Sequence, residues 1–68
     1  MENVKISTEF IKLDQFLKWT NVVSQGSDAK SLICSGLIKV NDEIEVRRGR
    51  KLRIGDIIEV NSKKFQIV

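Results

Sequence analysis

The sequence predicts a single α+β domain spanning residues 1–68, with the element order β-α-α-β-β-β-β. At 68 residues the chain is close to the lower limit for a domain that folds alone. Its first half carries apolar residues at helical spacing, and its second half carries short runs in which apolar and polar residues alternate. No repeat, linker or low-complexity stretch divides the chain, so we expect one compact unit.

The first strand and the first helix are predicted in the first twenty residues. The run from Val4 to Ser7 alternates apolar and polar residues, which is typical of a short strand. Ser7 and Thr8 are residue types that commonly cap a helix N-terminus. The helix after them is expected to bury one face, made of Phe10, Leu13, Phe16 and Leu17.

The second helix is predicted between a break at Gln25 and a stop at Gly36. Ser27 is suited to its N-cap position, and the apolar stripe that follows consists of Ala29, Leu32 and Ile33. Gly36 can adopt the left-handed conformation that commonly ends a helix.

Four strands are predicted in the remainder, at residues 37–40, 43–46, 57–60 and 65–68. Asn41 and Asp42 lie between the first two and tolerate the positive φ that a two-residue hairpin turn requires. Gly55 and Asp56 are expected to turn the chain into the third of these strands.

Residues 47–53, which we call the basic segment, carry the positive balance of the whole chain. Five of these seven residues are basic and none is acidic. The chain has 12 basic and 9 acidic residues, so the other positions are slightly acidic. A local positive charge on a balanced surface attracts phosphates, which predicts a nucleic-acid ligand.

Missing residue types argue against catalysis and metal binding. The chain has no histidine and no tyrosine, and Cys34 is its only cysteine. There is no Cys-x-x-Cys spacing and no glycine-rich phosphate loop, so we expect no catalytic residue, metal or cofactor. No apolar run reaches the length of a membrane span, and we expect a cytoplasmic protein.

Several short motifs follow one another in an order that resembles a known family. They are Lys12-Leu13-Asp14, Ala29-Lys30-Ser31-Leu32-Ile33, Gly36, Val40-Asn41 and Gly55-Asp56. The set resembles the RNA-binding domain named after small-subunit ribosomal protein S4, also called the alpha-L motif, over residues 10–60. The resemblance implies two helices packed against a small, bent antiparallel sheet, with a basic surface that binds structured RNA.

At two places the sequence departs from the usual pattern of this family. Gln25-Gly26 stands where the family usually has Ser-Arg, and Asn41-Asp42 stands where it usually has Asn-Gly. The basic segment is similar to that of the free-standing bacterial subgroup called YaaA or YbcJ. We expect this segment to replace the RNA-backbone contact that the family arginine, absent at Gly26, would make.

The predicted RNA-binding residues form two groups. The first is the basic segment, whose side chains can bind phosphate: Arg47, Arg48, Arg50, Lys51 and Arg53. The second group follows from the resemblance: Lys12, Lys30, Lys39 and Asn41. For each of these lysines a solvated surface role is the alternative, and for Asn41 a structural role in the turn is the alternative. Leu52 is expected to anchor the segment in the core.

Two further side chains are interpreted as packing residues. Trp19, the only tryptophan, is expected at the core or its edge, with stacking on an unpaired base as the alternative. Cys34 is expected to be a buried or half-buried small apolar side chain.

The sequence therefore predicts a non-catalytic module that binds structured RNA, with ribosomal RNA or a ribosome-associated particle as the expected partner. A DNA-binding accessory protein and an adaptor that docks an acidic protein are the alternatives. We expect alanine at Arg47, Arg48 and Arg50 to weaken RNA binding and to leave the fold intact.

Overall fold

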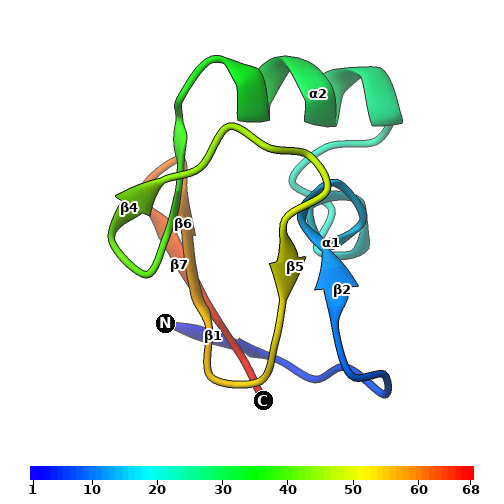
Figure 1. Ribbon diagram of the computed structural model, residues 1–68, viewed down its shortest axis with the longest axis vertical. Coiled ribbons are helices and arrows are strands. Elements are labelled where there is room, and N and C mark those ends of the chain that lie inside the picture. Colours follow the sequence, from blue (N-terminus) through cyan, green and yellow to red (C-terminus); the bar gives the residue numbers. More distant parts are fainter.

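The computed structural model describes residues 1–68 and contains two helices, a five-stranded sheet and a two-stranded ladder (Figure 1). The helices are α1 (Leu13–Trp19) and α2 (Gly26–Cys34). The sheet has the order β1-β7-β6-β3-β4, with β1 (Glu2–Val4), β3 (Ile38–Val40), β4 (Glu43–Ile44), β6 (Ile57–Val60) and β7 (Lys63–Ile67). The ladder joins β2 (Ile11–Lys12) to β5 (Lys51–Leu52). The α+β class is confirmed.

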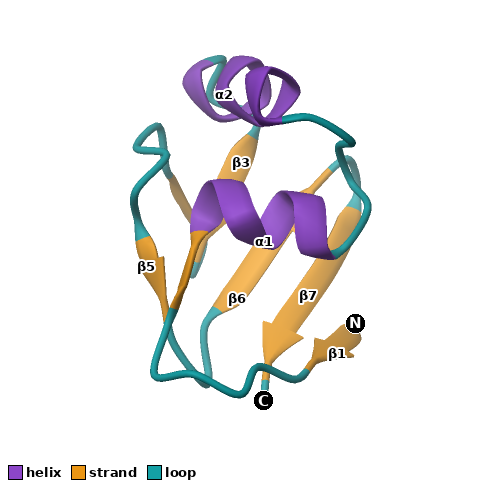
Figure 2. Ribbon diagram, turned by 90° about the vertical axis from the view of Figure 1, so that its right-hand side faces the viewer, coloured by secondary structure: helices purple, strands orange, loops and turns teal.

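The two helices lie on one side of the sheet, and the core lies between the helices and the sheet. Figure 2 shows α1 crossing in front of β6 and β7, with α2 across one end of the sheet. Phe16 of α1 meets Phe65 of β7 edge-on, with ring centroids 5.6 Å apart. Thirteen apolar side chains are buried here, which supplies the main driving force for folding: Val4, Leu13, Phe16, Leu17, Ala29, Ile33, Ile38, Val40, Leu52, Ile58, Val60, Phe65 and Ile67. Neither helix has the length and apolar character of a membrane span.

The predicted turn chemistry is confirmed. Asn41 and Asp42 have φ values of 52° and 69°, the left-handed values of a two-residue turn between β3 and β4. Gly36, with φ of 79°, follows the end of α2 as expected. Asn61 and Ser62 repeat this geometry between β6 and β7, with φ of 51° and 66°.

The predicted start of the first helix is wrong, because α1 begins only at Leu13. Residues 11 and 12 are extended instead and pair antiparallel with residues 52 and 51. Thr8 does not cap the helix, since its hydroxyl donates to the carbonyl of Phe10. Phe10 thus lies outside the helix and is half-buried.

The basic segment takes over the capping of α1. The N–H of Leu13 donates to the carbonyl of Arg50 at 2.9 Å, and the N–H of Asp14 donates to the carbonyl of Arg48 at 3.2 Å. These bonds satisfy two of the free N–H groups at the start of the helix, where the N-cap residue Lys12 makes no side-chain hydrogen bond. The segment predicted as a loop therefore contains a strand and holds a helix end.

Two smaller differences concern the other helix and the sheet. Gln25, rather than Ser27, occupies the N-cap position of α2. The first strand is Glu2–Val4 rather than residues 4–7, and it runs parallel to β7. The sheet is therefore mixed and not antiparallel throughout, because the two ends of the chain lie side by side.

Candidate functional site

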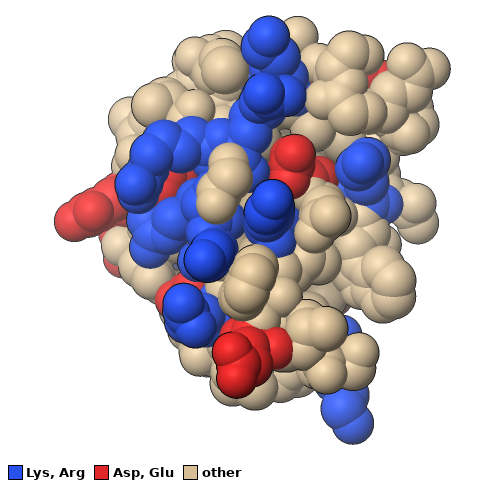
Figure 3. All heavy atoms as spheres, turned by 45° about the vertical axis from the view of Figure 1, so that its right-hand side comes forward, with Lys and Arg blue, Asp and Glu red and all other residues tan.

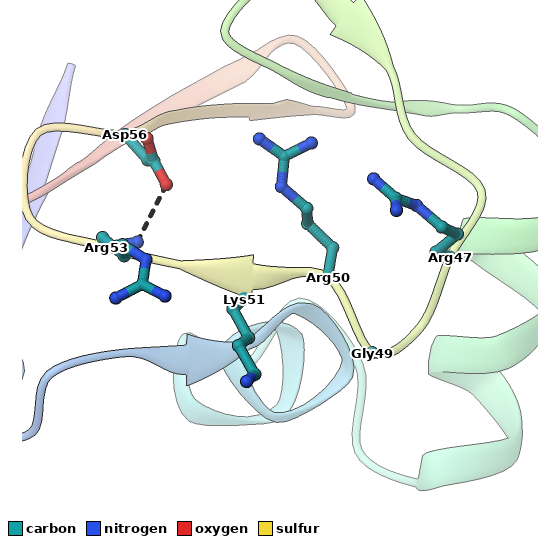
Figure 4. A pocket seen from close by; sticks show the side chains of 6 residues that line it. All are labelled: Arg47, Gly49, Arg50, Lys51, Arg53 and Asp56. Carbon is teal, nitrogen blue, oxygen red and sulfur yellow. Dashed lines mark hydrogen bonds between the residues drawn. The ribbon is translucent and has the colours of Figure 1, made fainter.

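Four side chains of the basic segment line one open depression at the protein surface. They are Arg47, Arg50, Lys51 and Arg53, which we call the cationic cluster. Gly49 and Asp56 complete the lining (Figure 4). The depression has a volume of about 660 Å³. Figure 3 shows that lysine and arginine side chains gather over a large area of one face of the molecule.

A buried carboxylate organises the two arginines of this cluster. Glu45 is only 6% exposed, and its backbone N–H donates to the carbonyl of Ile38, next to the core. Arg47 donates from Nε to Oε2 and from Nη2 to Oε1 of Glu45, each at 3.1 Å. Arg50 donates from Nη1 to Oε1 at 2.8 Å. Because the contact with Arg47 is bidentate, it fixes the plane of that guanidinium group.

The same hydrogen bonds keep Glu45 ionised. The side-chain hydrogen bond from Arg47 is the main cause that lowers the pKa of Glu45 from 4.5 to about 2. Burial opposes this shift, and the hydrogen bond from Arg50 reinforces it. The pKa of Arg47 is raised in turn by its hydrogen bond to Glu45. At neutral pH the carboxylate therefore holds both arginines in place.

The arginines keep donors for an external anion. A guanidinium group has five N–H donors, of which Glu45 accepts two from Arg47 and one from Arg50. The side chain of Arg47 is 72% exposed and that of Arg50 is 32% exposed. The pairing therefore orients these side chains and leaves them able to bind phosphate.

Strand β5 sends its side chains to alternate sides. Figure 4 shows Arg50 and Lys51 leaving the chain in opposite directions, and Leu52 is fully buried as predicted. Lys51 Nζ lies 4.8 Å from the ring centroid of Phe10, and Arg53 Cζ lies 5.9 Å from it. These cation–π contacts hold both charges against one aromatic ring.

Lys12 does not line the depression, but the ladder places it beside the cluster. It lies directly opposite Lys51 in the pairing of β2 with β5, and both lysines are exposed. Like charges at directly opposed positions destabilise a strand pair. An anion bound over this pair would relieve the repulsion.

The other predicted residues are not all part of this site. Arg48 is exposed in the turn before β5. Lys30 is exposed on α2, and Lys39 lies between two buried residues of β3, so it faces away from the core. Neither of these two lysines lines the depression.

Asn41 has a structural role. Its Nδ2 donates to Asp56 Oδ1 at 3.1 Å, and its Oδ1 accepts the N–H of Ile57 at 3.0 Å. Asp56 also accepts the N–H of Arg53 at 2.8 Å. Asn41 thus links the β3–β4 turn to the end of the basic segment, and a contact with RNA stays a prediction.

Glu45 and Phe10 are the residues that sequence reasoning missed. The available signal for Glu45 was its position two residues before Arg47 and five before Arg50. The prediction for Trp19 is wrong, because it is 67% exposed, and the prediction for Cys34 is also wrong, because it is exposed. No group of three potential metal ligands lies together.

Fold and site together define a small α+β domain with a preorganised cationic face. The chain belongs to the S4-domain family, whose model matches residues 4–68. It is 44% identical over 66 residues to the probable ribosome maturation protein RlbA of Bacillus subtilis (strain 168), covering 96% of this chain and 93% of that protein. The resemblance seen in the sequence motifs is thereby confirmed.

A solved structure shares the fold. The 30S ribosomal protein S4e of Thermoplasma acidophilum superposes with a TM-score of 0.68 at 18% identity, over 91% of this chain. The chain spans 33% of the length of that protein. The similarity therefore concerns about a third of S4e.

Proposed function

We propose that this protein is a non-catalytic module that binds structured RNA, and that the RNA is ribosomal or belongs to a ribosome-associated particle. The cationic cluster on an S4-family domain, with two of its arginines held in place by Glu45, is the observation that carries the proposal. The name of RlbA, a probable ribosome maturation protein, supports the ribosomal partner. The role would place the protein with ribosomes in the cytoplasm.

Phosphate contacts are expected to dominate the affinity. The four side chains of the cluster and Lys12 carry five positive charges, of which Glu45 offsets one, so log K should fall with log[salt] at a slope of roughly −2.8 to −3.6. Arg48, Lys30, Lys39 and Asn41 are proposed as further contacts at the edge of the bound RNA.

The test uses basic residues that do not pair with Glu45. The variant Arg48→Gln/Lys51→Gln/Arg53→Gln should bind a short hairpin RNA more weakly, with a salt slope shallower by about 2 to 3. The matched control Lys18→Gln/Lys63→Gln/Lys64→Gln removes as many exposed charges outside both the basic segment and the depression, and it should change the slope by less than about 1.

Equal effects of the two triple variants would contradict the proposal. Competition by duplex DNA as strong as that by hairpin RNA at the same salt would favour the DNA-binding alternative. Association with an acidic protein that survives nuclease treatment would favour the adaptor.

A further inference from the structure

A second depression lies between α1 and the segment that leads from β1 to β2; this segment runs below α1 in Figure 2. We call it the aromatic groove, and its volume is about 530 Å³, within the range of roughly 300 to 1,000 Å³ typical of small-ligand sites. Phe10, Trp19, Ile6 and Ile11 form its apolar wall, and Lys5 and Gln15 stand beside them. None of its lining residues is acidic.

The indole of Trp19 is the unusual feature of this groove. It is 67% exposed, although packing of α1 buries the neighbouring Leu17 completely. Gln15 lies one helical turn before Trp19 and faces the same groove. An exposed indole and an amide in the same groove suit a flat ligand that has polar edges.

The aromatic groove adjoins the cationic cluster at Phe10. Phe10 lines the groove, and its ring centroid lies 4.8 Å from Lys51 Nζ and 5.9 Å from Arg53 Cζ. An anion held by these two charges would therefore place its neighbouring groups at the groove. Lys5 adds a positive charge within the groove itself, which favours a polyanion as the occupant.

We propose that the aromatic groove receives an unpaired nucleobase of the RNA whose phosphates bind the cationic cluster, an inference that rests on the proposed function. Trp19 stacks on the base, and Gln15 offers its amide to the base edge. Lys5 meets the adjoining phosphate. The protein thus recognises an unstacked nucleotide in addition to the phosphates of the RNA backbone.

The test compares three hairpin RNAs that differ at one position: a bulged adenosine, an abasic residue in its place, and no bulge. We expect the bulged RNA to bind more tightly than the abasic one by about 5- to 100-fold, the effect of one base–aromatic stack. Because Trp19 is the only tryptophan, its fluorescence should change with the bulged RNA and not with the abasic one.

Substitutions inside and outside the groove test whether the groove causes the preference for the bulged RNA over the abasic one. Trp19→Ala should bind the bulged and abasic RNAs equally, and Trp19→Phe should retain part of the difference. Ile44→Ala, at a side chain that is 62% exposed outside the groove, should leave the preference unchanged.

Three results would overturn the inference. If all three RNAs bind equally with a steep salt dependence, the groove takes no base and the proposed function stands. If no RNA binds, both proposals fall. If Trp19→Ala weakens binding to purified ribosomal subunits but not to the bulged RNA, the groove docks a protein instead.

Discussion

Glu45 couples the proposed RNA-binding surface to the stability of the fold. Its buried carboxylate is neutralised by Arg47 and Arg50, and removing one partner of a buried ion pair leaves a charge uncompensated. Alanine at both arginines is thus expected to disturb the fold, contrary to the expectation from the sequence. A loss of RNA binding in such a variant would not distinguish the missing arginines from a disturbed fold.

A single substitution tests this coupling. Arg50→Ala should lower the free energy of unfolding by about 1 to 3 kcal/mol, because Glu45 loses its shortest hydrogen bond while Arg47 still pairs with it. Arg48→Ala, at an exposed side chain that makes no ion pair, should change it by less than about 0.5 kcal/mol. Urea denaturation followed by circular dichroism measures both, and equal effects would contradict the role of Glu45.

The ionisation of Glu45 also predicts how stability depends on pH. Its folded-state pKa of about 2 lies below the ordinary value of 4.5, so the unfolded chain takes up a proton at a higher pH than the folded one. The contribution, up to about 3 kcal/mol, is fully present above about pH 5 and is lost as the pH falls from about 4.5 to about 2.

Acid titration of the unfolding free energy measures this contribution. Glu45→Gln should be less stable at neutral pH and should show a flatter profile between about pH 5 and pH 2. A profile that falls as steeply in the variant as in the parent protein would assign the acid sensitivity to other carboxylates.

At the scale of elements, the β2–β5 ladder connects the basic segment to the core. Leu52 is buried while the flanking Lys51 and Arg53 are exposed, so the strand alternation presents the charges outward. The segment caps α1 through the carbonyls of Arg48 and Arg50. Its backbone is therefore held at both ends, which limits the entropy lost when a ligand binds.

The β3–β4 turn is the second element that positions the site. Asn41→Ala removes two side-chain hydrogen bonds and places alanine at a φ of 52°, so the free energy of unfolding should fall by about 1 to 3 kcal/mol. Asp42→Gly, at a φ of 69°, should be neutral or stabilising because glycine adopts that conformation freely. Thermal unfolding distinguishes the two variants.

RNA binding by the Asn41→Ala variant answers a separate question. Below its unfolding temperature, an unchanged affinity would assign Asn41 a structural role alone. A loss of affinity in the folded variant would support the predicted contact with RNA.

At the scale of the whole molecule, the pairing of the two ends of the chain adds β1 to the sheet as an edge strand. Strand β1 pairs parallel with β7, and the N–H of Val68 donates to the carbonyl of Val4 at 2.9 Å. Val4 is 7% exposed and belongs to the core. In so small a domain, each buried side chain is a large share of the net stability.

Val4→Ala should therefore lower the free energy of unfolding by about 1 to 2 kcal/mol and Tm by roughly 4 to 15 °C. Asn3→Ala changes the exposed neighbour in the same strand and serves as the control. A Tm that responds equally to both changes would show that β1 is not part of the cooperative unit.

The sequence by itself determined the features that depend on near neighbours. The left-handed turn at Asn41 and Asp42, the stop at Gly36 and the alternation around Leu52 follow from residue type and local spacing. The concentration of positive charge in residues 47–53 is likewise a property of the sequence. Short motifs at family spacing identified the domain for the same reason.

Only the tertiary structure decided the features that depend on distant partners. Residues 11 and 12 are extended because residues 51 and 52 pair with them, which overrides the local preference for a helix cap at Ser7 or Thr8. The alternation in residues 43–46 would bury Ile44 and Val46, yet the core accepts Glu45 because two arginines neutralise it. The two arginines are near Glu45 in the chain, but the burial of its carboxylate depends on how the whole chain packs around it, so the local pattern alone could not fix it.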